Sequence, residues 1–324
     1  MTRGAAQHAD AVPAKAGMSV FQQPVRVEER GINKEMHRKI SLCLLCCIVM
    51  ILAPATLQAA SLRIKAKSAI LMDMTSGRIL FSKNPDRPMP PASLTKILSL
   101  YLVHEAMREM KVHPQDRVKV SENASRTRGS HMRLSPGDDV SLEELIKGMA
   151  IVSGNDASVA VAEYMGGDVE TFVEKMNEKA RELDMTQSRF QNPHGLPAKN
   201  QFTTARDILK LSQAYLQDFP ESMKIHSMRS FTFEGSTLRN SNNLLNDCPD
   251  VDGLKTGFVG RAGYHIVATA KRGETRLIAV VMGCRNYRTR TREAIKLLRA
   301  GFEMANRDAA PSGNGDLGEE DEEP

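Results

Sequence analysis

The 324-residue sequence contains no tryptophan, and aromatic residues make up only 5% of it. No segment repeats at a fixed period, which argues against a solenoid or a propeller. The eight histidines lack the spacing of metal ligands, so we expect neither a metal site nor a cofactor. The hydrophobic content of 41% nevertheless supports a sizeable core, and the length allows one large domain or two ordinary ones.

A long hydrophobic run is also missing. The longest one, residues 40–53, is too short to span a bilayer core of about 30 Å comfortably. Basic residues precede it and small residues near Ala59 follow it, which is the order of a secretory signal peptide. Because this pattern begins at Met36, we interpret residues 1–60 as an N-terminal extension plus signal peptide, with Met36 as the true start. The prediction is export to the periplasm or the outer face of the cytoplasmic membrane, with an uncleaved anchor or a buried helix as the alternative.

The charge is unevenly distributed along the chain. Residues 1–60 carry a net +3 and residues 307–324 a net −6, so residues 61–306 hold +8 within the total of +5. Such a basic body suits an anionic polymer such as the cell wall, or a membrane surface, and an ordinary solvated surface is an equal alternative. We expect no nucleic-acid partner. Residues 306–324 are rich in Gly and Pro and then acidic, which predicts a disordered tail.

Cysteine is scarce in the body of the chain. Three of the five cysteines lie in the predicted signal peptide, which leaves Cys248 and Cys284. Two cysteines in an exported protein raise the question of a disulfide. Because we expect these two at opposite ends of a sheet, we predict that they are not bonded.

Hydrophobic periodicity predicts strands at both ends of the body and helices between them. Apolar runs around a turn at residues 75–77 predict a β-hairpin over residues 69–84. Helical patterns follow from residue 92, with a break at Ser153–Gly154 and with Thr203 or Thr204 as the N-cap of the last helix of this region. After residue 230, the segments SFTFEG, VDGLKTGF, GYHIVATAKR and TRLIAVVMGC are predicted strands, and a final helix follows.

The strands of the two ends can share one sheet only if the helical middle is an insertion beside it. This arrangement predicts an α/β fold with a mostly helical lobe, and a cleft at the seam between lobe and sheet.

Pro90 and Pro91 lead into a helix that carries Ser93 and Lys96 three residues apart, on one face. A helix N-terminus favours a developing oxyanion and disfavours an ammonium group, so this position promotes a neutral lysine. To act as a base near pH 7, Lys96 must lose about three pKa units, at a cost of roughly 4 kcal/mol. Burial and a second cation nearby can supply that shift.

The stretch DGLKTGF offers the second cation, because Lys255 stands at the beginning of a predicted strand. Gly257 allows an extended peptide to approach that strand, and Thr256 offers a hydroxyl to a carboxylate. In the stretch SGNDA, Ser153 can relay a proton, and the Asn155 amide can hold an amide group of a substrate.

Each of these motifs is weak by itself. Ser-x-Asn occurs three times, starting at Ser121, Ser153 and Ser241, but only the second falls at a break between two predicted helices. The three motifs, each in its required context and in this order, form a strong signal.

With these motifs, residues 67–302 resemble the serine D-alanyl-D-alanine carboxypeptidases, the low-molecular-mass penicillin-binding proteins. The segments AILMDMTSGRILFSKN, PPASLTKIL, SGNDASVAVAEYMGG, FVEKMNEKARELDMT, NPHGL and DGLKTGF…AGYHIVATA all look like that family. The resemblance implies the β-lactamase/transpeptidase-like fold, a five-stranded antiparallel sheet flanked by helices with a mostly helical lobe. It makes residues 61–305 a penicillin-binding D,D-peptidase domain and residues 306–324 a tail.

The resemblance also implies a catalytic role for residues of all three motifs. Ser93 would be the acyl-accepting nucleophile, and Lys96 would be its base. Ser153, together with Lys255, would pass the proton to the leaving D-alanine. Asn155 would orient the acyl part of the peptide.

Substrate binding is implied for a further set of residues. Thr256 would grip the terminal carboxylate beside Gly257, and the backbone N–H groups of Ser93 and Phe258 would form the oxyanion hole. The carboxylate-binding arginine of the family falls at Arg290, with Arg288 and Arg292 as neighbouring alternatives. The sequence departs from the family pattern in two respects: Phe258 follows Lys-Thr-Gly, and no β-rich domain or amphipathic anchor follows residue 302, which puts anchoring by that route in doubt.

The implied function is an exported carboxypeptidase that removes the terminal D-alanine from peptidoglycan stem pentapeptides through a Ser93 acyl-enzyme. Its partners would be a stem peptide ending in D-Ala-D-Ala and β-lactams as covalent inhibitors. The alternatives are a D,D-endopeptidase, a class A-like β-lactamase and a non-catalytic wall-binding protein. The β-lactamase would need a Glu-x-x-Leu-Asn string, which the sequence lacks. We interpret His194 as a loop-shaping residue, and Met165 and Met176 as core residues.

Overall fold

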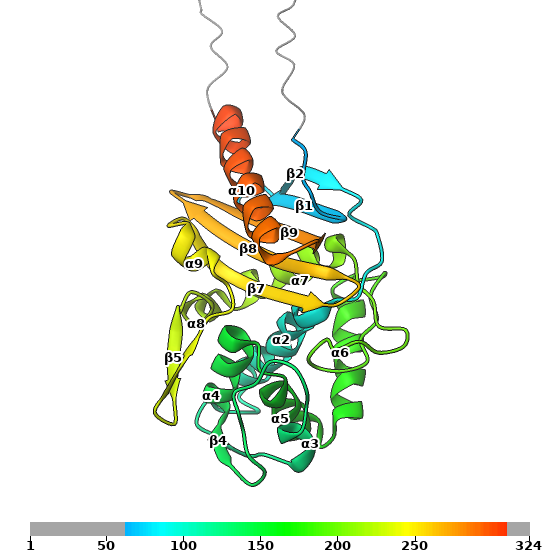
Figure 1. Ribbon diagram of the computed structural model, residues 1–324, viewed down its shortest axis with the longest axis vertical. Coiled ribbons are helices and arrows are strands. Elements are labelled where there is room, and N and C mark those ends of the chain that lie inside the picture. The colour runs from blue at the N-terminus through cyan, green and yellow to red at the C-terminus, as the bar shows by residue number, and fades with distance from the viewer. Residues whose placement is uncertain (1–61, 310–324) are drawn as a thin grey trace, which may run out of the picture. The chain divides into compact units, whose positions relative to one another are not determined.

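The computed structural model describes residues 62–309. The interpreted signal peptide and the acidic part of the predicted tail lie outside the described residues. A five-stranded antiparallel sheet, in the order β2-β1-β9-β8-β7, forms the centre of the fold (Figure 1). Its strands are β1 (Ser68–Asp73), β2 (Arg78–Lys83), β7 (Val251–Val259), β8 (Gly263–Arg272) and β9 (Thr275–Cys284). The predicted fold class is confirmed.

The two ends of the described chain meet in this sheet, because β1 pairs with β9, with Ala69 opposite Val281 and Met72 opposite Ile278. The hairpin of β1 and β2 is closed by Asp73, whose carboxylate accepts the Thr75 N–H (2.9 Å) and the Ser76 hydroxyl (2.6 Å). The predicted hairpin over residues 69–84 is therefore confirmed. At the other side of the sheet, β7 is an edge strand.

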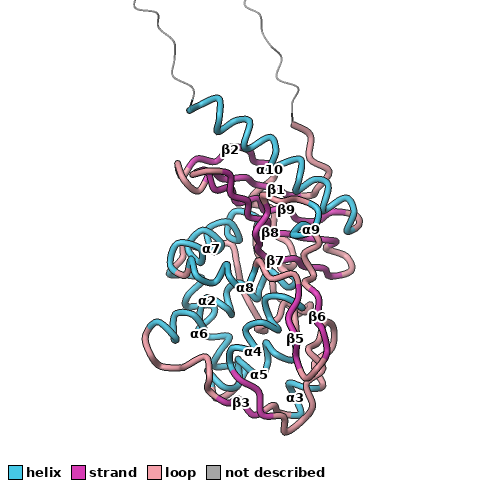
Figure 2. Tube along the Cα trace, turned by 90° about the vertical axis from the view of Figure 1, so that its left-hand side faces the viewer, coloured by secondary structure: helices cyan, strands magenta, loops and turns pink. Residues whose placement is uncertain are grey.

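The sheet separates two hydrophobic cores. On one face it is covered by α10 (Tyr287–Ala309), where Leu297 and Phe302 are buried against strand residues such as Ala279 and Val281. On the other face it packs on the helical lobe through α2 (Thr95–Arg108) and α7 (Ala205–Asp218). Figure 2 shows this three-layer arrangement from the side.

The helical lobe is the insertion between β2 and β7. Several of its helices begin at side-chain caps: Ser141 forms a capping box with Glu144, Asp168 accepts the Thr171 N–H, and Thr204 accepts the Asp207 N–H. Thr204 is thus the N-cap. The helices of the lobe besides α2 and α7 are α3 (Glu122–Ser125), α4 (Leu142–Lys147), the π-helix η2 (Gly148–Val152), α5 (Asn155–Gly166), α6 (Val169–Glu182), η3 (Pro220–Ser222), α8 (Met223–His226) and α9 (Leu244–Asp247).

Two short hairpins lie outside the main sheet. One pairs β3 (Arg117–Lys119) with β4 (Asp139–Ser141), and the other pairs β5 (Ser230–Phe233) with β6 (Ser236–Arg239). The predicted strand SFTFEG is therefore a strand, but it closes on its own neighbour instead of joining the main sheet.

Three further predictions from the sequence can be compared with the structure. Lys255 lies in the middle of β7, not at its beginning, because the strand already starts at Val251. Helix α10 continues to Ala309, past the predicted domain boundary at residue 305. Cys248 and Cys284 are both free thiols.

Among residues 62–309, no helix has the length and apolar character required to cross a membrane.

We expect Leu297→Ala to lower the free energy of unfolding by about 2–5 kcal/mol, because the side chain of Leu297 is fully buried between α10 and the sheet. Met110→Ala is the matched control, since Met110 is 78% exposed. Urea denaturation of both variants measures the difference, and equal stabilities would contradict this packing of α10.

Candidate active site

Ser93 and Lys96 lie at the start of the central helix of the lobe. Ser93 belongs to the 3-10 turn η1 (Ala92–Leu94), which leads directly into α2. The Lys96 side chain is completely buried, and its Nζ lies 3.2 Å from Ser93 Oγ, 2.6 Å from Asn155 Oδ1 and 2.9 Å from the His194 carbonyl oxygen. The only ligands of this buried amine are therefore neutral oxygens among the described residues, and one of them is the Ser93 hydroxyl.

Ser153 and Asn155 enter the same region from the junction between η2 and α5. Ser153 has a left-handed backbone (φ 64°), which is uncommon for a residue with a side chain and marks an imposed geometry. Asn155 is fixed from both ends of its amide, because its Nδ2 donates to the Arg128 carbonyl at 2.6 Å and its Oδ1 accepts from Lys96. The predicted break at Ser153–Gly154 is confirmed.

Lys255 reaches the cleft from the edge strand β7. Its buried Nζ donates to Ser153 Oγ at 2.9 Å and to the Thr256 carbonyl at 3.1 Å. The site thus contains two serine–lysine pairs, Ser93–Lys96 and Ser153–Lys255, each joined by a hydrogen bond.

Two glycines allow the segments to approach this closely. A Cβ at Gly195 would lie 1.8 Å from the Ala92 carbonyl oxygen, and Gly195 also has φ +88°. A Cβ at Gly257 would lie 3.2 Å from the Ser93 nitrogen. Strand β7 therefore lies directly against the turn that carries Ser93.

The electrostatics of the site favour neutral amines. Burial, and next the positive charge of Lys255, hold the pKa of Lys96 well below its usual value of 10.5, against an opposing contribution from Asp156. Burial, and next the Arg290 guanidinium, lower the pKa of Lys255 to about 7. This is the combination of desolvation and a nearby cation that activates a lysine as a base.

A cleft of about 400 Å³ is lined by all of the predicted substrate-binding residues except Lys255, which is only 1% exposed. Its lining residues are Ser93, Gly129, Ser130, Ser153, Asn155, His194, Gly195, Leu196, Ser241, Thr256, Gly257, Phe258, Val259, Tyr264 and Arg290. Larger cavities exist elsewhere on the described chain, one of about 750 Å³ along α10. None of the candidate catalytic residues lines that cavity, so chemistry, not size, identifies the site.

One end of this cleft is suited to an anion. Arg290 is 6% exposed, and within the described part of the chain its buried Nε has no hydrogen-bond partner. Thr256 Oγ1 lies nearby in the lining, 2.9 Å from Ser241 Oγ. Arg288 and Arg292 line the separate cavity along α10, so of the three arginines only Arg290 lines this cleft.

Phe258 lies at the same end of the cleft. Its side chain is 54% exposed and packs against Tyr264 of β8, with ring centroids 4.3 Å apart and the ring planes tilted by 33°. The structure therefore leaves the Phe258 ring as an open apolar wall of the cleft.

His194 has no geometry for a serine–histidine mechanism. Its Nδ1 accepts the N–H of Leu196 at 3.1 Å, and its carbonyl accepts from Lys96. Burial, and next the charge of Lys96, lower the pKa of His194 to about 3. These contacts support the interpretation of His194 as a loop-shaping residue. Across residues 62–309, no group of three or more His, Cys, Asp or Glu side chains is placed to hold a metal ion.

The sequence analysis assigned no role to seven residues that line the cleft. Ser241 belongs to the third Ser-x-Asn, which could have suggested it. The other six are Gly129, Ser130, Gly195, Leu196, Val259 and Tyr264. By contrast, Ser121 and Asn123 of the first Ser-x-Asn both bind Glu163, away from the two lysines.

The five-stranded sheet with its helical lobe, and the two serine–lysine pairs at their seam, define the class of β-lactamase/transpeptidase-like proteins. Within this class, the family of D-alanyl-D-alanine carboxypeptidases, peptidase S11, matches residues 55–286. The chain belongs to that family.

Individual relatives agree with this assignment. The chain is 44% identical over 257 residues to D-alanyl-D-alanine carboxypeptidase DacC of Escherichia coli, a match that covers 77% of this chain and 64% of that protein. It thus spans less than two thirds of the length of that relative.

Solved structures share the fold. Penicillin-binding protein 5 of Haemophilus influenzae superposes with a TM-score of 0.72 at 42% identity, over 74% of this chain and 72% of that chain. Penicillin-binding protein D2 of Listeria monocytogenes, in its ampicillin-bound form, gives a TM-score of 0.69 at 29% identity, over 74% and 99%.

The low pKa of Lys255 predicts a pH dependence of stability. The folded chain binds the Lys255 proton with a pKa of about 7, against an ordinary value of 10.5. Between these values the unfolded chain binds more protons, so stability rises with pH by at most about 1.4 kcal/mol per unit. We therefore expect the unfolding free energy of the wild type to rise relative to that of Lys255→Met between pH 7 and pH 9.

Urea denaturation at a series of pH values measures this difference. The control is Lys271→Met, which removes an exposed lysine of β8 and should give a curve parallel to that of the wild type. Parallel curves for the wild type and Lys255→Met would show that Lys255 is not held neutral by the fold.

Proposed function

We propose that this chain is an exported serine-type D-alanyl-D-alanine carboxypeptidase that removes the terminal D-alanine from peptidoglycan stem pentapeptides. The observation that carries this proposal is the pairing of Lys96 Nζ with Ser93 Oγ at 3.2 Å, beside the pairing of Lys255 Nζ with Ser153 Oγ at 2.9 Å. Family membership supports it, and so does a cleft that is apolar and cationic at the end where a carboxylate would lie.

Acylation would begin with Lys96 as general base. Its neutral amine takes the Ser93 proton while Ser93 Oγ attacks the carbonyl carbon of the penultimate D-alanine. The backbone N–H groups of Ser93 and Phe258 would stabilise the negative oxygen of the tetrahedral intermediate. The approach of Gly257 to the Ser93 nitrogen brings these two segments together.

The leaving group needs a proton as the C–N bond breaks. Ser153 would donate its hydroxyl proton to the departing amine of D-alanine and recover a proton from Lys255, to which it is hydrogen-bonded. The product of this step is an ester of Ser93 and free D-alanine. Lys96 must first pass the Ser93 proton on to Lys255, which is neutral after this step, and is then a base again. It would deprotonate a water molecule that attacks the ester carbonyl, and return that proton to Ser93 Oγ as the ester C–O bond breaks and the shortened stem peptide leaves.

Substrate recognition would use both ends of the cleft. Thr256, Ser241 and Arg290 would bind the terminal carboxylate, and the fixed amide of Asn155 would orient the acyl part. Because β7 is an edge strand of the sheet, its free backbone groups can pair with an extended peptide.

Export and inhibition complete the proposal. The signal-like pattern of residues 36–60 supports a location in the periplasm or at the outer face of the cytoplasmic membrane, where membrane-surface association would suit the basic body of the chain. β-Lactams would acylate Ser93 as substrate mimics, as the ampicillin-bound form of the Listeria relative suggests.

Ser93→Ala should abolish covalent labelling by fluorescent penicillin and lower the release of D-alanine from a stem pentapeptide by at least about 10⁴-fold, because the nucleophile is lost. Ser125→Ala, which removes a hydroxyl from the surface helix α3, is the control and should leave both activities unchanged.

The same assays separate the alternatives. Rapid turnover of penicillin by the wild type would indicate a β-lactamase, and cleavage of cross-linked dimers in preference to pentapeptides would indicate an endopeptidase. No labelling of the wild type would indicate a non-catalytic wall-binding protein. Each of these results would contradict the proposed carboxypeptidase.

Arg290→Gln should lower kcat/KM for a pentapeptide with a free C-terminal carboxylate by about 10- to 100-fold, the effect expected for losing a hydrogen bond to a charged group. For the same peptide with a C-terminal amide, we expect little difference between variant and wild type. Arg288→Gln is the matched control, since Arg288 lies outside the cleft. Equal losses on both substrates would show that Arg290 does not bind the carboxylate.

A further inference from the structure

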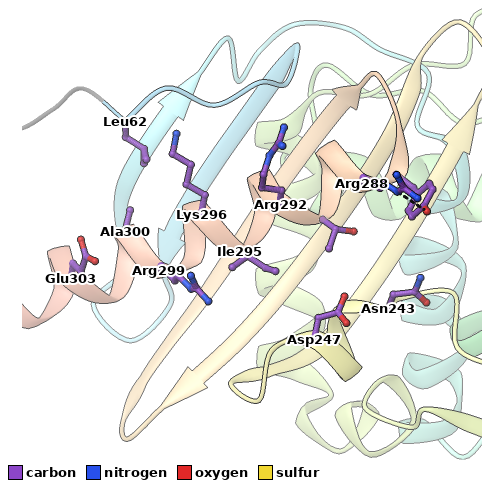
Figure 3. A pocket seen from close by; sticks show the side chains of 12 residues that line it. Leu62, Asn243, Asp247, Arg288, Arg292, Ile295, Lys296, Arg299, Ala300 and Glu303 are labelled. Atoms are coloured by element: carbon purple, nitrogen blue, oxygen red, sulfur yellow. Dashed lines mark hydrogen bonds between the residues drawn. The ribbon is translucent and has the colours of Figure 1, made fainter.

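The outer face of α10 carries a row of four exposed cations, Arg288, Arg292, Lys296 and Arg299. Their spacing of four, four and three residues places them on one side of the helix. Together with apolar residues such as Leu62 and Ile295, and with the carboxylates of Asp247 and Glu303, they line a groove of about 750 Å³. Figure 3 shows the cations along the helix, with Asn243 and Asp247 from the neighbouring segment across the groove.

Asp247 and Glu303 also line the groove, but few ion pairs neutralise its four cations among residues 62–309. Arg288 donates to the hydroxyl of Tyr287 at 3.0 Å, and Lys296 donates to the carbonyl of Arg63 at 2.6 Å, both neutral acceptors. Arg292 lies 3.5 Å from the carboxylate of Glu293, whose side chain is only 4% exposed. No carboxylate of the described chain forms an ion pair with Arg288, Lys296 or Arg299, so these cations can bind an anionic occupant.

We propose that the occupant is the acidic segment of this same chain, residues 310–324, folded back along α10. That segment contains six carboxylates and no lysine or arginine. The carboxylates are Asp316, Glu319, Glu320, Asp321, Glu322 and Glu323. The charges of segment and groove are therefore complementary, and the contact is independent of the proposed enzymatic activity.

The length of the segment matches the distance it must cover. From Ala309 back to Arg299 and Lys296 the helix rises about 15 to 20 Å. The acidic run at residues 319–323 follows Ala309 by ten to fourteen residues, and a Gly-rich chain of that length has a root-mean-square span of about 17–22 Å. A tether whose span matches the separation of its two ends raises the effective concentration to the millimolar range.

Charge also decides between this occupant and an anionic lipid or wall polymer. Either polyanion would be attracted by the four cations, but it would be repelled by six carboxylates tethered to the end of the same helix. The tethered segment needs no second molecule, and its effective concentration is set by the length of its tether alone. Its contact with α10 would screen the basic face from external polyanions.

Zero-length cross-linking of the full chain with a carbodiimide tests the proposal, because it joins a carboxylate to an amine only when the two are in contact. Lys296 is the one lysine of the row. We expect peptides in which Lys296 is bonded to one of the carboxylates at residues 319–323, identified by mass spectrometry after proteolysis. We expect these cross-links to fall at least fivefold in 0.5 M salt.

Charge reversal supplies the matched comparison. The triple variant Arg288→Glu, Arg292→Glu and Arg299→Glu should lower the Lys296 cross-links at least fivefold. The control reverses the charge of three exposed arginines of the helical lobe and should leave the Lys296 cross-links unchanged. These control substitutions are Arg126→Glu, Arg229→Glu and Arg239→Glu.

Several results would overturn the proposal. Cross-links spread evenly over the exposed lysines Lys119, Lys224 and Lys271 would show that the segment has no preferred site. Cross-links mainly between two molecules would show an intermolecular contact. Loss of the Lys296 cross-links on adding phosphatidylglycerol vesicles at physiological salt, with tight vesicle binding by the wild type but not by the triple variant, would show that the groove prefers a lipid surface.

Discussion

The site depends on the burial of two lysine amines within one small volume. An amine in water holds its proton until about pH 10, whereas Lys96 and Lys255 lie out of solvent and close enough for the charge of one to oppose the charge of the other. Because desolvation disfavours the charged form, each amine can be neutral near pH 7, and both amines are hydrogen-bonded to serine hydroxyls. Burial of the amines, which costs stability, is the source of the chemistry.

The fold holds these amines in place. The two ends of the described chain close one sheet, and the helical insertion between them supplies three of the four hydroxyl- or amine-bearing residues. Close approach at Gly195 and Gly257 then locks the turn that carries Ser93 between a loop of the lobe and the edge strand. The carboxylate of Asp156 secures the opposite wall by accepting the backbone N–H groups of Met132, Arg133 and Leu134. A shift of any of these segments would admit water to the amines and restore their ordinary basicity.

Much of this arrangement could be predicted from the sequence, because hydrophobic periodicity and motif order are local signals. The hairpin, the break at Ser153 and a helix cap at Thr203 or Thr204 all follow from a few neighbouring residues, and the structure selects Thr204. The sequence could not show that β5 pairs with β6 instead of joining the main sheet, since its alternating pattern suits any sheet. Ser241 and Tyr264 escaped notice for a similar reason: their place in the cleft depends on tertiary contacts with Thr256 and Phe258. Likewise, the sequence could not distinguish Arg290 from Arg288 and Arg292, because the choice depends on the direction in which each side chain leaves α10.

The most direct test of the central claim is an NMR titration of the Lys96 side chain in protein with isotopically labelled lysine, assigned by comparison with Lys96→Arg. A pKa well below the ordinary value of 10.5, rising when Lys255 is replaced by Gln, is the predicted result. A Lys96 amine that titrates at its ordinary pKa in the folded protein would contradict the account, because Ser93 would then have no base.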